Sequence, residues 1–119
     1  VEQYWPNAIS IVVPTTPALA YLDQGKMSLA LRIPADTQIA HLLQKTGALL
    51  TTSANAPGQT PAHTITAAQA YFGDAADFFV DGGDLSGRDA STIIRVVDDA
   101  VEVIREGAVK INDNGEVIT

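Results

Sequence analysis

The stretch "ADTQIAHLLQKTGALLTTSANAPGQTPA", residues 35–62, decides the fold class. Residues 35–47 carry apolar side chains at helical spacing, and Gly47 suits the left-handed conformation that ends many helices. Residues 48–52 are a short apolar run bounded by small polar residues, which predicts a buried strand. A helix followed at once by a strand favours an α/β (α+β) domain with a mixed sheet.

The rest of the chain repeats these two kinds of element, so we expect one domain over residues 1–119. β-branched or alternating runs that stop at proline or glycine predict strands, and a second apolar run predicts a helix. The predicted strands are residues 8–14, 27–34 and 76–83, with two more within 91–107 around a turn at Asp98 and Asp99. The second predicted helix is 64–74, and residues 15–25 are expected to form a loop with one helical turn. A last hairpin is expected over 108–119, with its turn at Asn114 and Gly115.

Composition and charge exclude several classes of protein. The chain has no cysteine, which rules out disulfides, thiolate zinc sites and a cysteine nucleophile. Its net charge of −7 argues against broad nucleic-acid binding, which needs a positive surface. No apolar run approaches the roughly 18 residues of a membrane helix, and no signal peptide is recognisable. We therefore expect a cytoplasmic protein that does not enter a membrane.

A hydroxyl and an amide lie two residues apart where the predicted strand 48–52 stops. Ser53 and Asn55 precede a turn rich in proline and glycine, which gives them a rigid backbone at the rim of a sheet. In α/β sheets this rim is where ligands bind. The two side chains suit phosphate, ribose or carboxylate oxygens. Ordinary turn chemistry explains the same residues equally well.

Two further polar features could bind a ligand. Residues 81–92, "DGGDLSGRDAST", form a glycine-rich loop that ends in Ser91 and Thr92, at the start of the next predicted strand. The loop lacks the Gly-Lys-Ser/Thr ending of a Walker A motif, and a solvated connection is the alternative. Arg32 lies on the less apolar face of its strand, where it could bind a carboxylate or phosphate through two hydrogen bonds. A surface arginine is the alternative there.

Metal-binding patterns are weak in this sequence. His41 and His63 have no ligand-like spacing. Asp81 and Asp84 could hold Mg²⁺ through oxygen ligands, but two loop aspartates are weak evidence. We therefore predict no protein-bound metal.

Five segments, read together, resemble a known family. They are "WPNAISIVVP", "SLALRIP", "LLTTSANAPGQTPA", "FFVDGGDLSGRDASTIIRV" and "IREGAVK", in this order between Tyr4 and Lys110. In combination they closely resemble the C-terminal portion of the YrdC-like family, the threonylcarbamoyl-AMP synthases. The resemblance implies a twisted mixed β-sheet with flanking helices, incomplete relative to the full family domain.

The resemblance also implies a reaction. Enzymes of this family combine L-threonine, bicarbonate and ATP into threonylcarbamoyl-AMP and pyrophosphate. Mg²⁺ is expected with the ATP phosphates. A partner transferase then uses the product to make threonylcarbamoyladenosine in tRNA.

Site residues follow from the motifs that match. Ser53 and Asn55 correspond to a Ser-x-Asn pair that helps bind the nucleotide phosphates and the intermediate. Arg32 corresponds to the arginine that holds the threonine carboxylate. Ser91, with Thr92, corresponds to the Ser-Thr near the adenylate and the threonine. No catalytic side chain is assigned by this resemblance.

The chain also departs from the family pattern. Asn7 stands where the family usually has glycine, and Arg95 stands where many relatives carry an acidic or other polar residue. The family's first strand, its Thr-x-Thr-Tyr-Gly-Leu-like segment and its basic Lys-x-Arg segment do not occur here. We therefore expect this chain alone to be inactive or nearly so, as part of a longer enzyme or a shortened form of one. An unpaired strand edge would then invite self-association as a homodimer.

Two other functions remain open at this stage. The chain could be a non-catalytic nucleotide- or RNA-binding YrdC-like module, although its acidic balance predicts weak or no direct RNA binding. It could also be the YrdC-like domain of a hydrogenase-maturation carbamoyltransferase, which adenylates a carbamoyl group.

Overall fold

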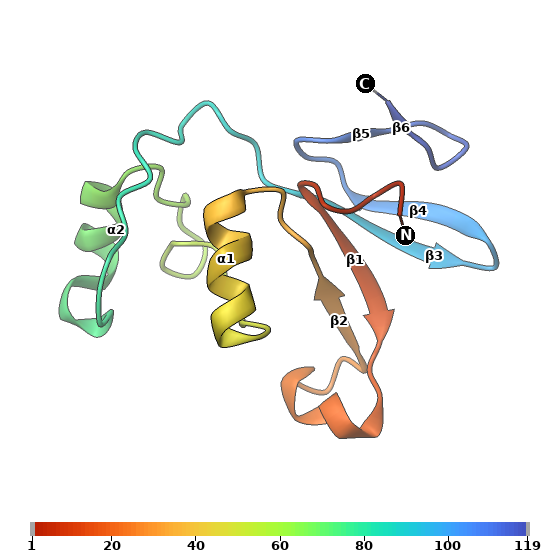
Figure 1. Ribbon diagram of the computed structural model, residues 1–119, viewed down its shortest axis with the longest axis horizontal. Coiled ribbons are helices and arrows are strands. Elements are labelled where there is room, and N and C mark those ends of the chain that lie inside the picture. The colour runs from red at the N-terminus through yellow and green to blue at the C-terminus, as the bar shows by residue number, and fades with distance from the viewer. Residues whose placement is uncertain (1, 119) are drawn as a thin grey trace. The chain divides into compact units, whose positions relative to one another are not determined.

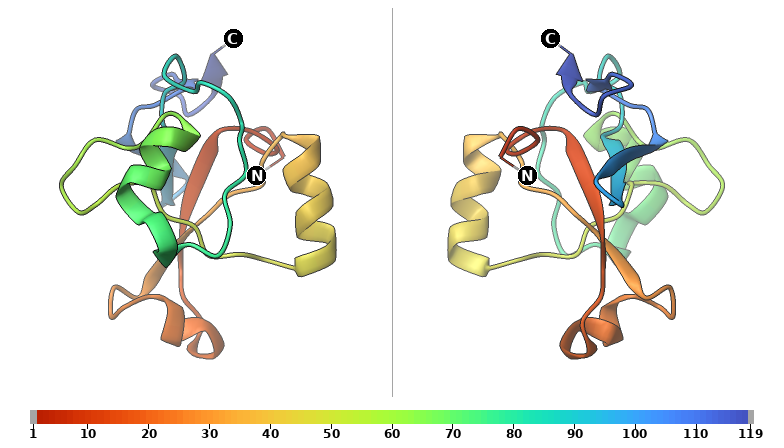
Figure 2. Two further views of the ribbon diagram at one scale, coloured as in Figure 1. Left: turned by 90° about the vertical axis from the view of Figure 1, so that its left-hand side faces the viewer. Right: turned by 90° about the vertical axis from the view of Figure 1, so that its right-hand side faces the viewer.

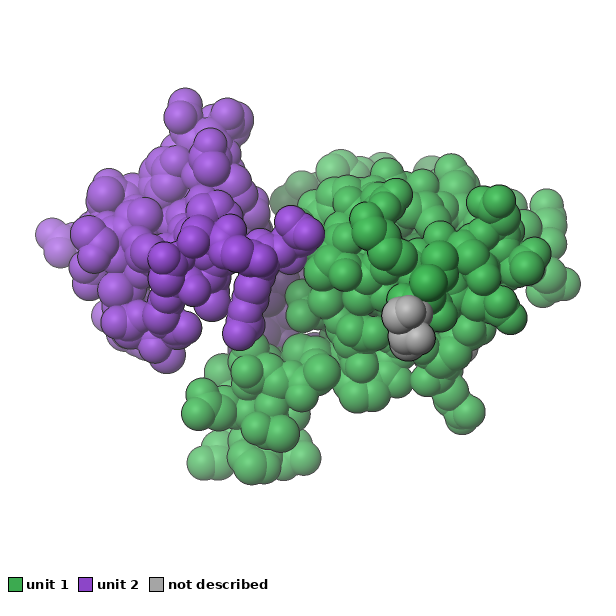
Figure 3. All heavy atoms as spheres, turned by 90° about the horizontal axis from the view of Figure 1, so that it is seen from above, with its two compact units in different colours: residues 1–47, 90–119 green, residues 48–89 purple. Residues whose placement is uncertain are grey.

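The computed structural model describes residues 2–118. Contacts divide the chain into two compact units (Figure 3): unit 1 is Val1–Gly47 with Ala90–Thr119, and unit 2 is Ala48–Asp89. Within the described residues, no helix is both long and apolar enough to cross a membrane. The assignment of residues 1–119 to one domain stays a prediction.

Unit 1 is built on a four-stranded mixed sheet, as the sequence predicted (Figure 1). Strand β1 runs parallel to β3, whereas the β1–β2 and β3–β4 pairs are antiparallel, which gives the order β2-β1-β3-β4. The bounds are Ile9–Pro14 for β1, Ser28–Leu31 for β2, Thr92–Val97 for β3 and Ala100–Arg105 for β4.

Two predicted hairpins are confirmed in unit 1. Strands β3 and β4 turn at Asp98 and Asp99, whose φ angles of 51° and 63° match the tight turns that fit the twist of paired strands. The second hairpin joins β5 (Lys110–Ile111) to β6 (Val117–Ile118), with Gly115 at a φ of 81° in its turn.

The core of unit 1 is small and aliphatic. Ile9, Ile11 and Ile94 are buried on the paired strands β1 and β3, together with Tyr4. The Tyr4 hydroxyl donates to the backbone oxygen of Gly115, which ties the second hairpin to this core. Trp5 lies against the same cluster and donates its indole N–H to the Ile9 oxygen at 2.8 Å.

Both predicted helices are present (Figures 1 and 2). Helix α1, Thr37–Thr46, begins where the Asp36 carboxylate accepts the Ile39 N–H at 3.0 Å. Helix α2, Ile65–Phe72, begins where the Thr64 hydroxyl accepts the Ala67 N–H. Neither helix buries a residue. The remaining helical segments are short 3-10 turns at Pro17–Leu22 and Gly73–Ala75.

Two predicted strands are wrong. Residues 48–52 and 76–83 form no strand, and the expected burial of 48–52 is wrong as well, because Leu50 is 76% exposed. A strand needs a hydrogen-bonded neighbour, and within residues 2–118 neither segment has one. Strand β2 is also shorter than the predicted 27–34, since Met27 has a φ of 58° and cannot continue an extended chain.

Candidate ligand-binding site

Strand register gathers polar side chains at one end of the unit 1 sheet. Arg32 directly follows Leu31, the residue of β2 that pairs with Ile11 near the start of β1. Ser91 directly precedes β3, which starts beside β1, and Arg105 on β4 pairs with Ile93. The end of the sheet therefore collects two guanidinium groups and the Ser91 hydroxyl from strands far apart in the sequence.

Arg32 keeps most of its hydrogen-bonding capacity at this end. Its Nε donates to the backbone oxygen of Asn7 at 3.2 Å, and the Asn7 N–H in turn donates to the Ile33 oxygen at 3.0 Å. No residue in the described range 2–118 accepts a hydrogen bond from its two terminal nitrogens. The guanidinium is exposed and anchored on one side, so its free edge can bind an anion with two donors.

Ser91 is held by two neighbours that the sequence analysis did not single out. Its hydroxyl lies 3.2 Å from the Ser10 hydroxyl on β1. Arg105 donates to the Ser91 backbone oxygen from Nε at 3.1 Å and from Nη2 at 2.8 Å, and Nη2 also lies 3.2 Å from the Ser91 hydroxyl. The Ser91 side chain is thus fixed at the sheet end while it stays partly exposed.

Thr92, unlike Ser91, lies in the protein interior and bonds only to backbone groups. It is fully buried, and its hydroxyl donates to the Val109 oxygen at 2.5 Å. The same hydroxyl accepts the N–H groups of Gly107 and Val109 at 3.0 and 3.1 Å. These three bonds use its donor and both acceptor positions. Thr92 therefore fastens the segment after β4, and its assignment to the adenylate stays a prediction.

A bulge explains why sequence reasoning missed Arg105. The register shifts between Ile93 and Ile94, so Ile104 has no opposite residue on β3 and the following side chain changes direction. Gly107 allows the backbone to pass closely, because a Cβ there would lie 2.2 Å from the Ala90 oxygen. The sequence contained one indication of this role. In the segment "IREG", Arg105 stands two positions before Gly107, the glycine that the close backbone approach requires.

In unit 2, Ser53 and Asn55 lie in one tight turn. The Asn55 N–H donates to the Ser53 oxygen at 3.1 Å, and the Asn55 side-chain amide donates to the Ala56 oxygen at 2.8 Å. Because the side-chain nitrogen makes that bond, the side-chain oxygen Oδ1 is the atom left to accept another hydrogen bond. The Oδ1 atom is buried and has no hydrogen-bond partner among the described residues. A buried acceptor without a donor is uncommon and favours a ligand or water that supplies one.

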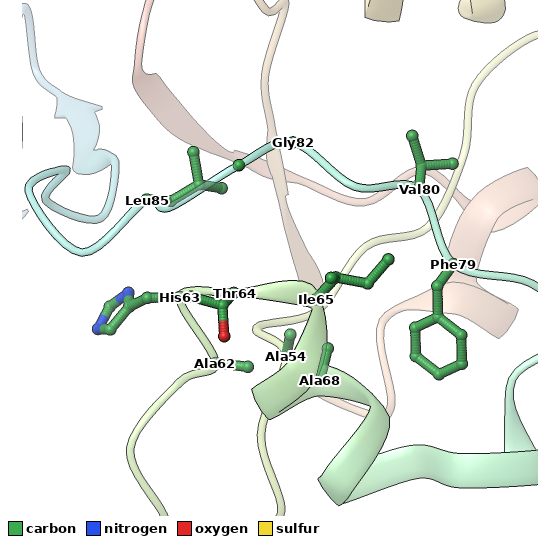
Figure 4. A pocket seen from close by; sticks show the side chains of 11 residues that line it. Ala54, Ala62, His63, Thr64, Ile65, Ala68, Phe79, Val80, Gly82 and Leu85 are labelled. Atoms are coloured by element: carbon green, nitrogen blue, oxygen red, sulfur yellow. The ribbon is translucent and has the colours of Figure 1, made fainter.

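A hollow in unit 2 brings two of the predicted polar segments together (Figure 4). It measures about 190 Å³ and lies between Ala54 of the Ser-x-Asn turn, the start of helix α2, and the pair Gly82 and Gly83. The Leu85 N–H donates to the His63 oxygen at 2.8 Å and holds these segments together. The lining is mainly alanine, glycine and aliphatic side chains, which suits a small group rather than a charged one.

The acidic residues of the 81–92 loop stabilise local turns. Asp81 accepts the Gly83 N–H and Asp84 accepts the Ser86 N–H, both at 2.9 Å. Hydrogen bonds from the Ser86 side chain and then its backbone lower the pKa of Asp84, with a further contribution from His63. No group of three or more metal-ligating side chains occurs within the described part of the chain.

Known proteins match most of this chain. The Sua5, YciO and YrdC family model, described as "Telomere recombination", matches residues 1–107. The threonylcarbamoyl-AMP synthase of Klebsiella pneumoniae is 35% identical over 107 residues, which are 87% of this chain and 54% of that protein. The enzyme of the same name from Halorhodospira halophila is 34% identical over 97 residues, covering 80% of this chain and 50% of its own.

A Mycobacterium leprae relative aligns over 119 residues, 99% of this chain and 54% of its own length, at 29% identity. The chain thus spans about half the length of the curated relatives it matches. Among solved structures, P. abyssi Sua5 complexed with L-threonine superposes with a TM-score of 0.81 over 92% of this chain and 33% of its own, at 20% identity. This likeness establishes the fold and confirms the predicted YrdC-like architecture.

Proposed function

The chain belongs to the Sua5, YciO and YrdC family, and we propose that it forms the part of a threonylcarbamoyl-AMP synthase that binds threonine and the adenylate. The relatives named threonylcarbamoyl-AMP synthase support this activity, and the P. abyssi relative was solved with L-threonine. The product would serve a transferase that modifies tRNA.

One observation carries the proposal: Arg32, directly after the outer strand β2, and Arg105, on the outer strand β4, stand at the same end of the sheet. In a chain of net charge −7, two cations at one sheet end form a local site for anions. Three strand spacings separate the outer strands, roughly 14 Å. This separation leaves room for a ligand larger than a single small anion, such as an adenylate that carries both a phosphate and the carboxylate of threonine.

Each polar side chain of unit 1 then has a separate task. The free edge of the Arg32 guanidinium binds the threonine carboxylate through two hydrogen bonds. The Ser91 hydroxyl contacts the adenylate or the threonine. Ser10 and Arg105 fix the rotamer of Ser91, and the Arg105 guanidinium also adds positive charge at this end of the sheet. Thr92 holds the backbone from Gly107 to Val109 behind them.

The turn in unit 2 supplies a different kind of contact. The Ser53 hydroxyl can donate to a phosphate oxygen. Asn55 Oδ1 is an acceptor, so it suits an N–H or O–H of the ligand, and the carbamate N–H of the intermediate is the group of this kind closest to the reacting atoms. The proposal therefore assigns Ser53 to phosphate and Asn55 to the carbamate or ribose.

The reaction needs positioning and charge stabilisation more than a chemical group on the protein. The threonine amine and bicarbonate give a carbamate and release water, as the new C–N bond replaces a C–O bond of bicarbonate. A carbamate oxygen attacks the α-phosphorus of ATP, the bond to the β-phosphate breaks, and pyrophosphate leaves with the electron pair. Mg²⁺ enters as part of the ATP substrate. Because the basic segment of the family pattern is not in this chain, we expect it to bind ligands while turnover by it alone is close to zero.

Calorimetry with a matched variant tests the proposal. The chain is titrated with L-threonine in the presence of Mg²⁺-ATP and bicarbonate, and pyrophosphate is measured in the same samples. Arg32→Gln should weaken threonine binding by about tenfold or more, because it removes a charge-assisted pair. Lys45→Gln, which removes an exposed cation from helix α1, should leave the affinity unchanged.

Other outcomes separate the alternatives. An affinity for ATP that does not change when threonine is added would instead indicate a nucleotide-binding module. Binding of a carbamoyl donor in place of threonine would favour the carbamoyltransferase reading. Pyrophosphate release that requires both threonine and bicarbonate would contradict the expected loss of turnover.

A further inference from the structure

The turn of the β5–β6 hairpin contains a chemically labile pair of residues. Asn114 is followed by Gly115, and none of the other asparagines, at positions 7, 55 and 112, precedes a glycine. An asparagine before glycine deamidates readily, because glycine has no Cβ to crowd its backbone nitrogen. Asn114 is exposed, and within residues 2–118 its side chain forms no hydrogen bond. Its side-chain amide is therefore open to attack.

The fold requires the glycine of this pair. Gly115 is buried and has a φ of 81°, a conformation that L side chains rarely adopt. A Cβ at this position would lie 2.6 Å from Cγ2 of Val101 on β4. Packing of the hairpin on unit 1 therefore demands glycine directly after Asn114.

Hydrogen bonds within the turn occupy the nitrogen that would react. The Gly115 N–H donates to the Asn112 oxygen at 2.9 Å. The Asn112 Oδ1 accepts the N–H groups of Asn114 and Glu116, both at 2.9 Å. These bonds must open before the Gly115 nitrogen can reach the neighbouring side chain.

Tertiary contacts oppose this opening. Strands β5 and β6 pair over only two residues each, and an isolated two-stranded hairpin is marginally stable. The Tyr4 hydroxyl donates to the Gly115 oxygen and so bonds the turn to the core of unit 1. Loss of that bond should favour the open turn.

We propose that Asn114 is a site of spontaneous deamidation whose rate is set by opening of the β5–β6 hairpin, which the Tyr4 hydroxyl opposes. In the open turn, the Gly115 nitrogen attacks Cγ of Asn114. The bond from Cγ to the side-chain nitrogen breaks, and ammonia leaves with the electron pair and with the proton given up by Gly115. Water then opens the five-membered imide at either carbonyl, which gives aspartate or isoaspartate.

Either product weakens the closed turn. The new carboxylate stands between Asp113 and Glu116 in a chain of net charge −7, and like charges this close repel. Isoaspartate also adds a methylene group to the backbone before Gly115. That residue can then no longer bond both the Asn112 oxygen and the Tyr4 hydroxyl in the present geometry. Deamidation therefore converts a transient opening of the hairpin into a lasting one.

Peptide mapping of the aged chain tests the proposal. The full 119-residue chain is incubated at neutral and mildly alkaline pH, and trypsin then cleaves after Lys110 to release residues 111–119. Mass spectrometry of this peptide follows Asn112 and Asn114 separately and distinguishes aspartate from isoaspartate. We expect conversion at Asn114 alone. A synthetic peptide of residues 108–119 lacks the core and should react about tenfold faster or more, because closed structure protects in proportion to its opening free energy.

Matched variants locate the protecting contact. Tyr4→Phe keeps the ring and removes the hydroxyl, and it should raise the rate about threefold or more because one hydrogen bond is lost. Tyr71→Phe is the control: it removes a hydroxyl that donates to the Thr60 oxygen in unit 2, and it should leave the rate unchanged. Asn112→Ala removes the side-chain acceptor within the turn and should also raise the rate, without altering the core.

Several results would overturn the proposal. If Asn114 does not convert, or Asn112 converts as fast, the glycine is not decisive. Equal rates for the folded chain and the synthetic peptide would mean that the closed hairpin gives no protection. If Tyr4→Phe and Asn112→Ala both react no faster than Tyr71→Phe, the hydrogen bonds of the turn do not control the rate. No ligand enters these measurements, so their outcome leaves the proposed function untouched.

Discussion

The two units contain similar sequence patterns and reach different states. In unit 1, the run Ile9–Pro14 pairs on both sides and buries Ile9 and Ile11. In unit 2, the apolar runs at 48–52 and 77–80 pair with nothing within residues 2–118, and none of the residues 48–89 is buried. The segments of the two units are similar in composition, and they differ in whether a neighbouring strand is present to pair with them.

This comparison teaches that β-propensity is conditional. A strand is stabilised by cross-strand side chains and ladder hydrogen bonds, both of which belong to the pair. Strands β1 and β3 are neighbours in the sheet although more than half of the chain separates them in the sequence. Residues 48–52 and 77–80 have the sequence of strands, but within residues 2–118 they have no neighbouring strand to pair with.

The largest expected effect contrasts one core residue of unit 1 with one exposed residue of unit 2. Ile94→Ala removes a fully buried side chain from β3 and should lower the free energy of unfolding by about 3 kcal/mol. Phe78→Ala, although it removes more atoms, should change it by less than about 0.5 kcal/mol because that ring is exposed. Urea unfolding followed by Trp5 fluorescence measures both. Equal losses for the two variants would mean that unit 2 is buried in solution.

The next effect concerns the buried hydroxyl of unit 1. Thr92→Val keeps the shape of the side chain but leaves the N–H groups of Gly107 and Val109 without an acceptor. The cost should be roughly 2–3 kcal/mol, since buried donors lose their partners. Thr92→Ser retains the hydroxyl and should cost only about 1 kcal/mol. Urea unfolding of the three chains tests this order, and a Thr92→Ser loss as large as that of Thr92→Val would show that the methyl group contributes as much as the hydroxyl.

The smallest effect is local to unit 2 and depends on pH. Folding lowers the pKa of Asp84 below its ordinary value of 3.8, chiefly through the Ser86 side chain. The associated stabilisation is therefore present above that value and is lost as the pH falls through the lowered pKa. Ser86→Ala should move the pKa back toward 3.8. A titration of the Asp84 carboxyl carbon by NMR, in the unchanged chain and in Ser86→Ala, measures the shift.

The candidate site was partly visible in the sequence. Arg32 was singled out on the less apolar face of a predicted strand and Ser91 at the start of another, and the register places both at one end of the sheet. Arg105 and Ser10 were not singled out. Their contacts with Ser91 depend on a bulge at Ile104 and on the β1–β3 pairing, and neither can be read from a local pattern.

The sequence was sufficient to predict the helices and the hairpin whose ends are fixed by interactions between nearby residues. Asp36 and Thr64 cap the two helices, Gly47 and Gly73 end them, and Asp98 with Asp99 turns the β3–β4 hairpin. In each case the deciding interaction lies within a few residues of the chain, so the sequence by itself determined the outcome.

Tertiary structure decided which apolar runs became strands and which hydroxyls were buried. Residues 48–52 and 9–14 are both apolar runs, yet only the second has neighbouring strands on both sides. Ser91 and Thr92 are adjacent and chemically alike, yet the first stays partly exposed and the second is buried against Gly107 and Val109. Pairing and burial are properties of segments distant in the sequence, and therefore only the folded chain fixes them.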